Sequence, residues 1–560
     1  MSSSFDLAII GSGFSGSLLA AIARRLGLSV VLIEKSKHPR FAIGESSTPL
    51  ANILLAELTT KYDLPRLRAL SKWGTWQDQN PHIAGGLKRG FTFCHHEKGK
   101  PFVADAQRSN QLLVAASPND RIGDTHWYRA AVDELFMQEA VAAGAEYLDQ
   151  TRLTKMTIGA SDVQLVGTRL RVPVDVRAKF IFDATGPRGF IHHAAGLFNR
   201  GFVGFPNTQG LMSHFYDVGK LEDLRSYQLY GEACPSAIAG GTDLIAGVES
   251  NSDRDLLVNG SSSQLKAELQ TDAELKTRIE PPYPVDDAAV HHVFDGGWMW
   301  VLRFNNGLTS AGIAVTDEMA GHLRLATGEK AWARLLEYFP GIDQQFAGAR
   351  LERPLIYNRR LSYLASATTG DRWAMLPSAA GFVDPLLSTG FPLTLLGLQR
   401  LANLLERDWG TDRFAAGIQD HAARTEREVS AAARLVAGLY RNMNNFSRFR
   451  DLSLLYFAAA SFSETVRRLG KPELAGSFLL ADDPKFGPAV AALLAAEPAN
   501  DSDLRAQVLA LIEPFDLAGL TRCDRKNWYP VDFDDLRAAA GKIEASSESV
   551  EGLIARCQTV

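Results

Sequence analysis

Short apolar runs on either side of a helical pattern open the chain. Residues 6–10 (DLAII) and 29–33 (SVVLI) are aliphatic runs typical of buried parallel strands. Between them, Leu18, Ile22 and Leu26 recur at the spacing of one helix face. This order predicts a strand, a helix and a second strand, which together form one βαβ unit.

The hydrophobic pattern varies along the rest of the chain. Residues 133–143 follow the period of an amphipathic helix, whereas residues 163–182, 210–220 and 290–315 favour strands. Beyond about residue 440 the pattern is mostly helical. Because strand and helix patterns alternate in this way, we expect an α/β protein.

A glycine-rich turn joins the first predicted strand to its helix. Gly11, Gly13 and Gly16 fit the GxGxxG pattern, and an acid, Glu34, closes the second strand. Glycines here allow a tight turn and close approach to a pyrophosphate, which the helix N-terminus attracts. Glu34 can accept hydrogen bonds from ribose hydroxyls. We predict a dinucleotide site, either NAD or FAD, that includes Gly11, Gly13, Phe14, Ser15, Gly16, Glu34 and Lys35.

Composition excludes several other classes of protein. The 59 Lys and Arg residues against 64 Asp and Glu residues give a net charge of −5, which argues against a nucleic-acid binder. The N-terminus has no signal-peptide pattern, and the longest apolar stretches, such as residues 452–462, are shorter than a membrane span. We therefore expect a soluble cytoplasmic protein that binds neither nucleic acid nor membrane.

Cysteine and histidine positions give no metal signature. The four cysteines are scattered, and no two lie at a zinc-site or CxxC spacing. Histidines occur in adjacent pairs, but neighbouring residues of a strand point to opposite faces, so one pair rarely supplies two ligands. We predict no metal site. The residues concerned are Cys94, Cys234, Cys523, Cys557, His95-His96, His192-His193 and His291-His292.

Three further segments resemble the flavin-dependent halogenases. They are residues 40–49 (RFAIGESSTP), 183–186 (DATG) and 380–390 (AGFVDPLLSTG). In that family the first and last of these segments lie against the flavin. The resemblance, which extends to about residue 440, implies FAD as the cofactor and implies contacts to it from Ser46, Ser47, Arg129, Asp183 and Asp384.

Two more matches are similar to segments that distinguish halogenases from hydroxylases. Residues 297–303 (GWMWVLR) resemble the Trp-x-Trp-x-Ile-Pro motif, although Leu302-Arg303 replaces Ile-Pro. Residues 88–93 (KRGFTF) resemble the stretch that carries the catalytic lysine, which would be Lys88. Leu387 stands where the tryptophan halogenases have a glutamate that assists an indole substrate.

The resemblance implies how the chemistry is divided among these residues. FAD, reduced in trans, would use O2 and chloride or bromide to form hypohalous acid, which Lys88 would relay to the substrate. The turn of Ser388, Thr389 and Gly390 suits a halide, because amides converge on an anion there. Trp298 and Trp300, at strand spacing, share a face. The predicted partition between flavin and substrate comprises Trp298, Trp300 and Leu387.

The fold expected from these matches is α/β, with a Rossmann-like FAD-binding domain, an inserted β-sheet substrate region and a helical C-terminal region. Residues 1–440 would form the FAD-binding halogenase core, with the β-rich substrate region at about 190–360. Residues 441–560 would form the helical C-terminal region. The sequence leaves the oligomeric state open.

The substrate class follows from Leu387, because leucine cannot accept a proton. A phenol or resorcinol activates its own ring, so we expect an electron-rich aromatic substrate of this kind. No second GxGxxG motif is evident, so a separate flavin reductase is the expected partner. Three alternatives stay open: a substrate tethered to a carrier protein, an FAD-dependent aromatic hydroxylase or other oxidoreductase, and a flavoprotein that acts only as a binding subunit.

Overall fold

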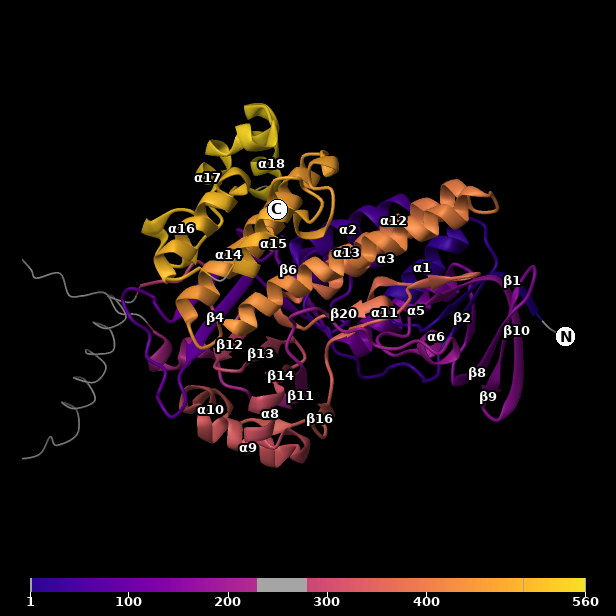
Figure 1. Ribbon diagram of the computed structural model, residues 1–560, viewed down its shortest axis with the longest axis horizontal. Helices are drawn as coiled ribbons and strands as arrows, with labels where there is room; N and C mark the ends of the chain where they lie inside the picture. Colours follow the sequence, from indigo (N-terminus) through magenta and orange to yellow (C-terminus); the bar gives the residue numbers. More distant parts are fainter. Residues whose placement is uncertain (1–2, 229–278, 497, 559–560) are drawn as a thin grey trace, which may run out of the picture.

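The computed structural model of the chain describes residues 3–228, 279–496 and 498–558 (Figure 1). Residues 229–278, which belong to the predicted β-rich region and include Cys234, lie outside the described residues. The described part confirms the α/β class, with two large sheets and a helical C-terminal region. None of its helices is long and apolar enough to cross a membrane.

The first sheet carries the predicted βαβ unit. β1 (Ser3–Ile10) pairs in parallel with β2 (Val30–Ile33) and with β10 (Val172–Asp183). α1 (Phe14–Arg25) connects β1 to β2, as the apolar spacing predicts. Its other strands are β7 (Glu146–Leu148), β8 (Thr151–Ile158), β9 (Val163–Arg169), β18 (Thr369–Gly370) and β19 (Trp373–Met375). The carboxyl ends of the central parallel strands meet at one edge, which is where such sheets bind ligands.

Helices cover one face of this sheet. α1 packs against α5 (Arg129–Ala142) and α12 (Gly390–Asp408), and all three contribute to the largest apolar core. The predicted helix at residues 133–143 is α5, which begins earlier, at Arg129. Leu18, Leu19 and Ile22 of α1 are fully buried. The βαβ unit therefore presents its glycine turn at the edge of a rigid layer.

The second sheet has the strand order β15-β11-β14-β13-β12-β4-β5-β21, with β16 beside β11. The strands predicted near residues 210–220 and 290–315 are confirmed as β11 to β14. The bounds are β4 (Gly90–His96), β5 (Gln111–Ala115), β11 (Thr208–Tyr216), β12 (Ala289–Phe294), β13 (Gly297–Arg303), β14 (Thr309–Thr316), β15 (Arg350–Leu351), β16 (Ile356–Asn358) and β21 (Trp528–Tyr529). Segments that precede residue 190 and follow residue 500 thus join this sheet.

The two faces of the second sheet pack against different helices. α8 (Asp317–Leu323), α9 (Glu329–Tyr338) and α10 (Pro340–Phe346) lie along its outer side, at the bottom of Figure 1. Met299 and Val301 of β13 face that layer, whereas Trp298 and Trp300 belong to the largest core. Alternation along β13 therefore turns both tryptophans toward the rest of the molecule.

Long helices connect the two sheets. α13 (Arg413–Arg441) packs beside α12 and runs diagonally across Figure 1. α14 (Phe446–Arg468) packs against α2 (Pro49–Lys61), α13 and α16 (Asp501–Ile512). The division predicted near residue 440 falls between α13 and α14. Because α14 contacts α2, the C-terminal helices cover the segment that follows the first βαβ unit.

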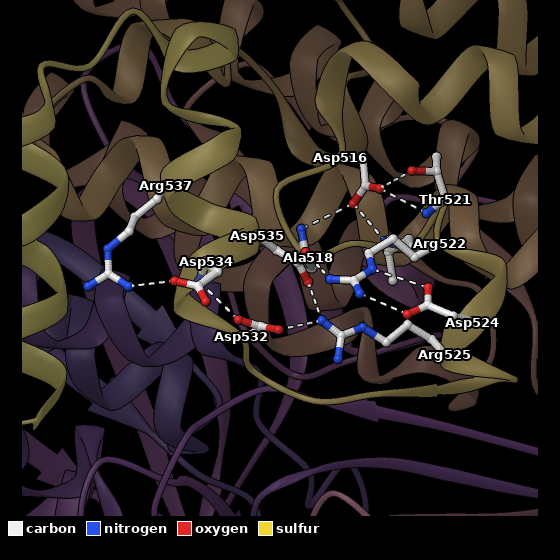
Figure 2. Close-up of polar contacts among 11 residues, drawn as sticks. Asp516, Ala518, Thr521, Arg522, Asp524, Arg525, Asp532, Asp534, Asp535 and Arg537 are labelled. Atoms are coloured by element: carbon white, nitrogen blue, oxygen red, sulfur yellow. Dashed lines mark hydrogen bonds and ion pairs between the residues drawn. The ribbon is translucent and has the colours of Figure 1, made fainter.

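An arginine and aspartate network shapes the end of the chain (Figure 2). Arg525 contacts both Asp532 and Asp535, and Arg522 contacts Asp535. The buried carboxylate of Asp516 accepts hydrogen bonds from the backbone N–H groups of three nearby residues: Ala518, Leu520 and Thr521. These contacts hold the loop that leads into β21, so this terminal region contributes a strand as well as helices.

Candidate active site

The glycine turn has the geometry that its motif predicts. Gly11 has φ +100°, and a Cβ there would lie 2.6 Å from the carbonyl oxygen of Ala184. A Cβ on Gly16 would overlap the carbonyl oxygen of Gly11. At Gly13 a Cβ would come no closer than 3.4 Å to the nearest side chain, that of Arg40. Gly11 and Gly16 are therefore needed for packing, whereas a Cβ on Gly13 would make only ordinary van der Waals contacts with Arg40, Arg129 and Asp133.

A groove of about 1570 Å³ lies at the carboxyl ends of β1, β2 and β10. Gly11, Glu34 and Lys35 line it, as expected for a dinucleotide site, and Arg40 also contributes. Gly13, Phe14, Ser15 and Gly16 are not among its lining residues. Phe14 and Ser15 are buried in α1, where the Phe14 ring stacks on Phe391 at 4.9 Å between centroids. The turn thus forms one end of the groove while its helix residues serve packing.

Glu34 is held by the glycine turn itself. Its Oε2 accepts a hydrogen bond from the backbone N–H of Ser12 at 3.0 Å, and its Oε1 accepts one from Ser36 at 2.9 Å. Burial alone would raise the pKa of Glu34, but the Arg40 guanidinium and these hydrogen bonds lower it overall. Glu34 is therefore a fixed carboxylate in the wall of the groove.

Two charged residues that the sequence reasoning missed complete this end of the groove. Arg40 Nη2 lies 3.7 Å from Glu34 and 3.7 Å from Asp133. Asp133 Oδ1 accepts a hydrogen bond from the Phe14 N–H at the start of α1. Arg129 is buried, pairs with both oxygens of Asp133, and donates to the carbonyl oxygens of Ile43 and Gly44. Arg40 is the first residue of the halogenase-like segment 40–49, and this position is the only feature of the sequence that could have indicated its role.

Asp183 lies beneath the groove and does not line it. Its two oxygens accept hydrogen bonds from the backbone N–H groups of Thr185 and Ile191, each at 2.8 Å. Burial raises its pKa above the ordinary range. Its contacts fix the loop of Ala184 and Thr185, which do line the groove.

A second cavity, of about 640 Å³, lies between the two sheets and is mostly apolar. We call it the inner cavity. The following predicted residues, from three separate stretches of chain, line it: Ser46, Trp298, Trp300, Asp384, Ser388 and Gly390. Thr389 and Leu387 are buried beside it but are not among its lining residues. Leu387 and Ser388 have φ of 63° and 54°, a left-handed turn that delivers the chain to the first residue of α12.

Asp384 is bound by residues of both neighbouring layers. Its Oδ1 accepts a hydrogen bond from Trp298 Nε1 at 3.1 Å, and its Oδ2 accepts one from the Tyr440 hydroxyl at 2.9 Å. Burial raises the pKa of Asp384 to about 7, although these hydrogen bonds oppose the change. Tyr440, which the sequence reasoning missed, thereby ties α13 to the wall of the inner cavity.

Lys88 is fully buried at the end of β3 (Gly85–Lys88). Its Nζ donates hydrogen bonds to Ser46 Oγ at 3.0 Å and to the Ser47 carbonyl oxygen at 2.7 Å. The same ammonium lies 3.8 Å from the centroid of the Phe91 ring. Burial lowers its pKa from 10.5 to about 7, so the neutral amine is accessible near neutral pH.

Asp124 is the cross-strand partner of Lys88. β6 (Asp124–Trp127) pairs antiparallel with β3, and the register places Asp124 opposite Lys88. Asn52 Nδ2 donates to Asp124 Oδ1 at 2.9 Å, while Oδ2 has no hydrogen-bond partner among the described residues. Burial raises the pKa of Asp124 to about 7. The Lys88 ammonium and the Asp124 carboxyl therefore titrate in the same pH range.

Further buried polar residues near the inner cavity were also missed. Glu45 lines it and lies 3.0 Å from His214 Nε2 of β11. His291 stacks on Trp298 at 5.2 Å between centroids, and burial together with Lys88 lowers its pKa to about 3. Within the described residues, no three His, Cys, Asp or Glu side chains form a group that could hold a metal ion.

Comparisons with known proteins agree with this geometry. Residues 9–49 match the family described as NAD(P)-binding Rossmann-like domain. The chain is 27% identical over 426 residues to tetracycline 7-halogenase of Kitasatospora aureofaciens, covering 73% of this chain and 66% of that protein. It is 24% identical over 439 residues to monodechloroaminopyrrolnitrin halogenase PrnC of Pseudomonas fluorescens, covering 76% and 66%. It thus spans just under two thirds of these relatives' length.

Solved structures show the same fold. The halogenase PltM in complex with phloroglucinol and FAD matches with a TM-score of 0.70 at 22% identity, over 93% of this chain and 99% of that one. PltM alone matches with a TM-score of 0.73 at 20% identity, over 94% and 99%. The fold and the groove define a flavoprotein of the Rossmann type. The relatives that the chain resembles over about three quarters of its length are flavin-dependent halogenases.

The groove fits the dinucleotide that this family uses. The buried Nε of Arg40 has no hydrogen-bond partner among the described residues, and the Arg40 side chain is 24% exposed beside the glycine turn. A guanidinium with an unpartnered donor, next to a glycine turn, matches the charge of a pyrophosphate. Arg40, Gly11 and Gly13 would therefore hold the pyrophosphate of FAD, and Glu34 would accept hydrogen bonds from a ribose.

The proximity of Asp124 to Lys88 gives a prediction about charge. Asp124→Asn removes a buried anion that favours the ammonium, so the pKa of Lys88 should fall below about 7. NMR titration of protein labelled at the lysine Cε would measure this shift, with the Lys88 signal assigned by its absence from Lys88→Met. Asp120→Asn is the control, because Asp120 is 61% exposed and pairs with Arg89. An unchanged titration in Asp124→Asn would contradict the coupling.

Proposed function

We propose that the protein is a flavin-dependent halogenase that acts on a phenol- or resorcinol-like aromatic substrate. The observation that carries the proposal is the position of Lys88. It is a buried lysine with a lowered pKa, bonded to Ser46 in the wall of the inner cavity. An ordinary lysine is solvated on the surface, so its burial here requires a reason beyond packing.

FAD would occupy the groove and extend toward the inner cavity. When bound in its reduced form, FAD supplies the electrons and activates the O2 that together convert a halide into hypohalous acid. The groove residues would hold the dinucleotide, as the tight turn at Gly11 and the Arg40 guanidinium support. A separate flavin reductase would supply the reduced cofactor.

The halide would bind at the turn of Ser388, Thr389 and Gly390. This turn leads into α12, a helix of 19 residues whose first N–H groups have no partners within the helix. Ser388 and Gly390 line the inner cavity, whose walls are apolar enough to strengthen the attraction of amides for an anion. Trp298 and Trp300 would separate the flavin from the substrate.

Lys88 would relay the halogen. As an ammonium it would donate a hydrogen bond to the oxygen of hypohalous acid, which makes the halogen more electrophilic. As a neutral amine it would exchange an N–H hydrogen for the halogen and release water. Ser46 and Ser47 hold the Nζ at a fixed position for either role.

The phenolic assignment rests on the absence of a carboxylate at Leu387. A phenol stabilises the positive charge that develops on its ring through its own oxygen, whereas an indole benefits from a nearby acid. PltM, which shares the fold, was solved with phloroglucinol, a phenol. The proposal therefore favours phenols over tryptophan.

A direct assay tests this function. The protein is incubated with a flavin reductase, NADH, FAD, chloride or bromide, and equal concentrations of resorcinol and tryptophan. We expect mass spectra of the resorcinol product to show the halogen isotope pattern, with much slower reaction of tryptophan. A gain of one oxygen would indicate a hydroxylase instead, and preferred halogenation of tryptophan would refute the phenolic assignment.

Substitution at the glycine turn tests the cofactor. Gly13→Val should purify largely without flavin, because the branched side chain would lie against Arg40 and displace the guanidinium that would hold the pyrophosphate. Flavin content is measured from absorbance after denaturation, and circular dichroism checks the fold. Gly11→Val is the contrast: its clash with Ala184 and its positive φ should damage the fold itself. A fully flavin-loaded Gly13→Val protein would exclude the proposed site.

Substitution of the relay residue tests the last step. Lys88→Met keeps most of the buried volume but removes the amine, so halogenated product should fall by roughly 10²–10⁴-fold, the range of acid–base groups. Flavin reoxidation and released hypohalous acid, followed with a chlorination-sensitive dye, should continue. Normal product yield from a folded, flavin-loaded Lys88→Met protein would show that Lys88 is not the relay.

A further inference from the structure

A third cavity lies beside Phe91, whose ring contacts Lys88. We call it the outer cavity. Phe91, whose ring carries the Lys88 ammonium on one face, forms part of its wall. Thr48 and Pro49, directly after the segment that binds Lys88, form another part. Lys88 lines neither cavity itself, but it bonds to Ser46 in the wall of the inner cavity and contacts Phe91 in the wall of the outer cavity. Lys88 and these two side chains therefore lie between the two cavities.

The C-terminal helices close the outer cavity. Tyr456, Phe457 and Glu464 of α14 line it opposite Phe91. An adjoining cavity of about 840 Å³ shares Ser461 and Glu464 with it and extends to Val531, which is 37% exposed. These two cavities share no lining residue with the dinucleotide groove, and they lie between the exposed Val531 and Phe91.

Glu464 is a polar residue of the outer cavity to which the proposed halogen chemistry assigns no role. Its Oε1 accepts a hydrogen bond from Arg468 Nε at 2.9 Å, and Oε2 accepts none within the described residues. The side chain is 17% exposed, although it lines two cavities inside the protein. Burial raises the pKa of Glu464, and the Arg468 guanidinium opposes this change. The ion pair with Arg468 occupies Oε1, so Oε2 is left to accept a hydrogen bond from a ligand.

The other walls suit an aromatic ring. Phe91 and Phe457 lie 5.3 Å apart between centroids at 69°, and Tyr456 stands beside them. The Tyr456 hydroxyl makes no hydrogen bond among the described residues and lies on the same helix as Glu464, two turns earlier. Apolar walls with a few unpartnered polar atoms are the ordinary composition of a small-molecule site.

We propose that the outer cavity binds the aromatic substrate and that Glu464 Oε2 accepts the hydrogen bond of its phenolic hydroxyl. This inference rests on the proposed function and adds the residue that determines substrate class and orientation. Glu464 of α14 would thus provide the acidic side chain that is absent at position 387, and it would do so from the opposite side of Lys88. Methyl ethers of the same phenols, which have no hydrogen to donate, would bind weakly.

The reaction balances with these groups in place. The phenolic O–H donates to Glu464 while the ring carbon attacks the halogen of hypohalous acid. The oxygen–halogen bond breaks, and the leaving hydroxide takes a proton from the Lys88 ammonium to form water. The ring then loses its C–H proton to the Lys88 amine, which restores both the ammonium and the aromatic ring.

Equilibrium binding tests the proposal without turnover. Titration calorimetry on protein loaded with oxidised FAD compares resorcinol with its dimethyl ether. We expect the wild-type protein to prefer resorcinol by about tenfold or more, the factor that a hydrogen bond to a charged group typically contributes. Glu464→Leu should reduce the preference to within about twofold, and Glu464→Gln, which can still accept from Arg468, should give an intermediate value.

Glu57→Gln is the matched control. Glu57 of α2 pairs with Arg467, next to Arg468 on α14, but lines neither cavity. Its substitution should leave the preference unchanged. Equal binding of both ligands to the wild-type protein, or an unchanged preference in folded Glu464→Gln and Glu464→Leu, would overturn the proposal. Intact selective binding without any halogenated product would count against the proposed function alone.

Discussion

The burial of the Lys88 ammonium is the constraint around which the site is organised. A buried charge is costly unless it is hydrogen-bonded, and here Ser46 and Ser47 provide acceptors while the Phe91 ring covers the remaining side. These contacts join the β3–β6 pair, the segment before α2 and the edge of the second sheet. Any displacement of one segment would leave the charge unpaired, so the lysine also fixes the wall between the two cavities.

The two sheets differ in construction, and each forms a different part of the site. The parallel sheet presents strand ends and one helix N-terminus at a common edge, which suits an extended anionic cofactor. The second, mostly antiparallel sheet presents alternating side chains, and so it lines a cavity on one face while α8, α9 and α10 pack on the other. Asp384 connects these layers through Trp298 and Tyr440.

The helices after residue 440 complete the site rather than simply cap it. α14 lies against α2 and brings Tyr456 and Glu464 to the outer cavity, across from Phe91. β21 joins the second sheet beside β5, and the Arg525 contacts with Asp532 and Asp535 hold the loops around it (Figure 2). Substrate selection can therefore depend on residues that lie far along the chain from the halogenase-like motifs.

The sequence by itself determined the features that depend on neighbouring residues: the βαβ unit with its glycine turn and the acid Glu34 after the second strand, the strands β11 to β14, and the shared face of Trp298 and Trp300. Backbone sterics and side-chain periodicity act over a few residues, so they can be read along the chain. Only the tertiary structure decided the rest. It turned Leu387 into the core, placed Asp183 beneath the groove, set Asp124 opposite Lys88, and brought Glu464 to the outer cavity. Burial and pairing between distant segments depend on how sheets and helices pack, which no local pattern records.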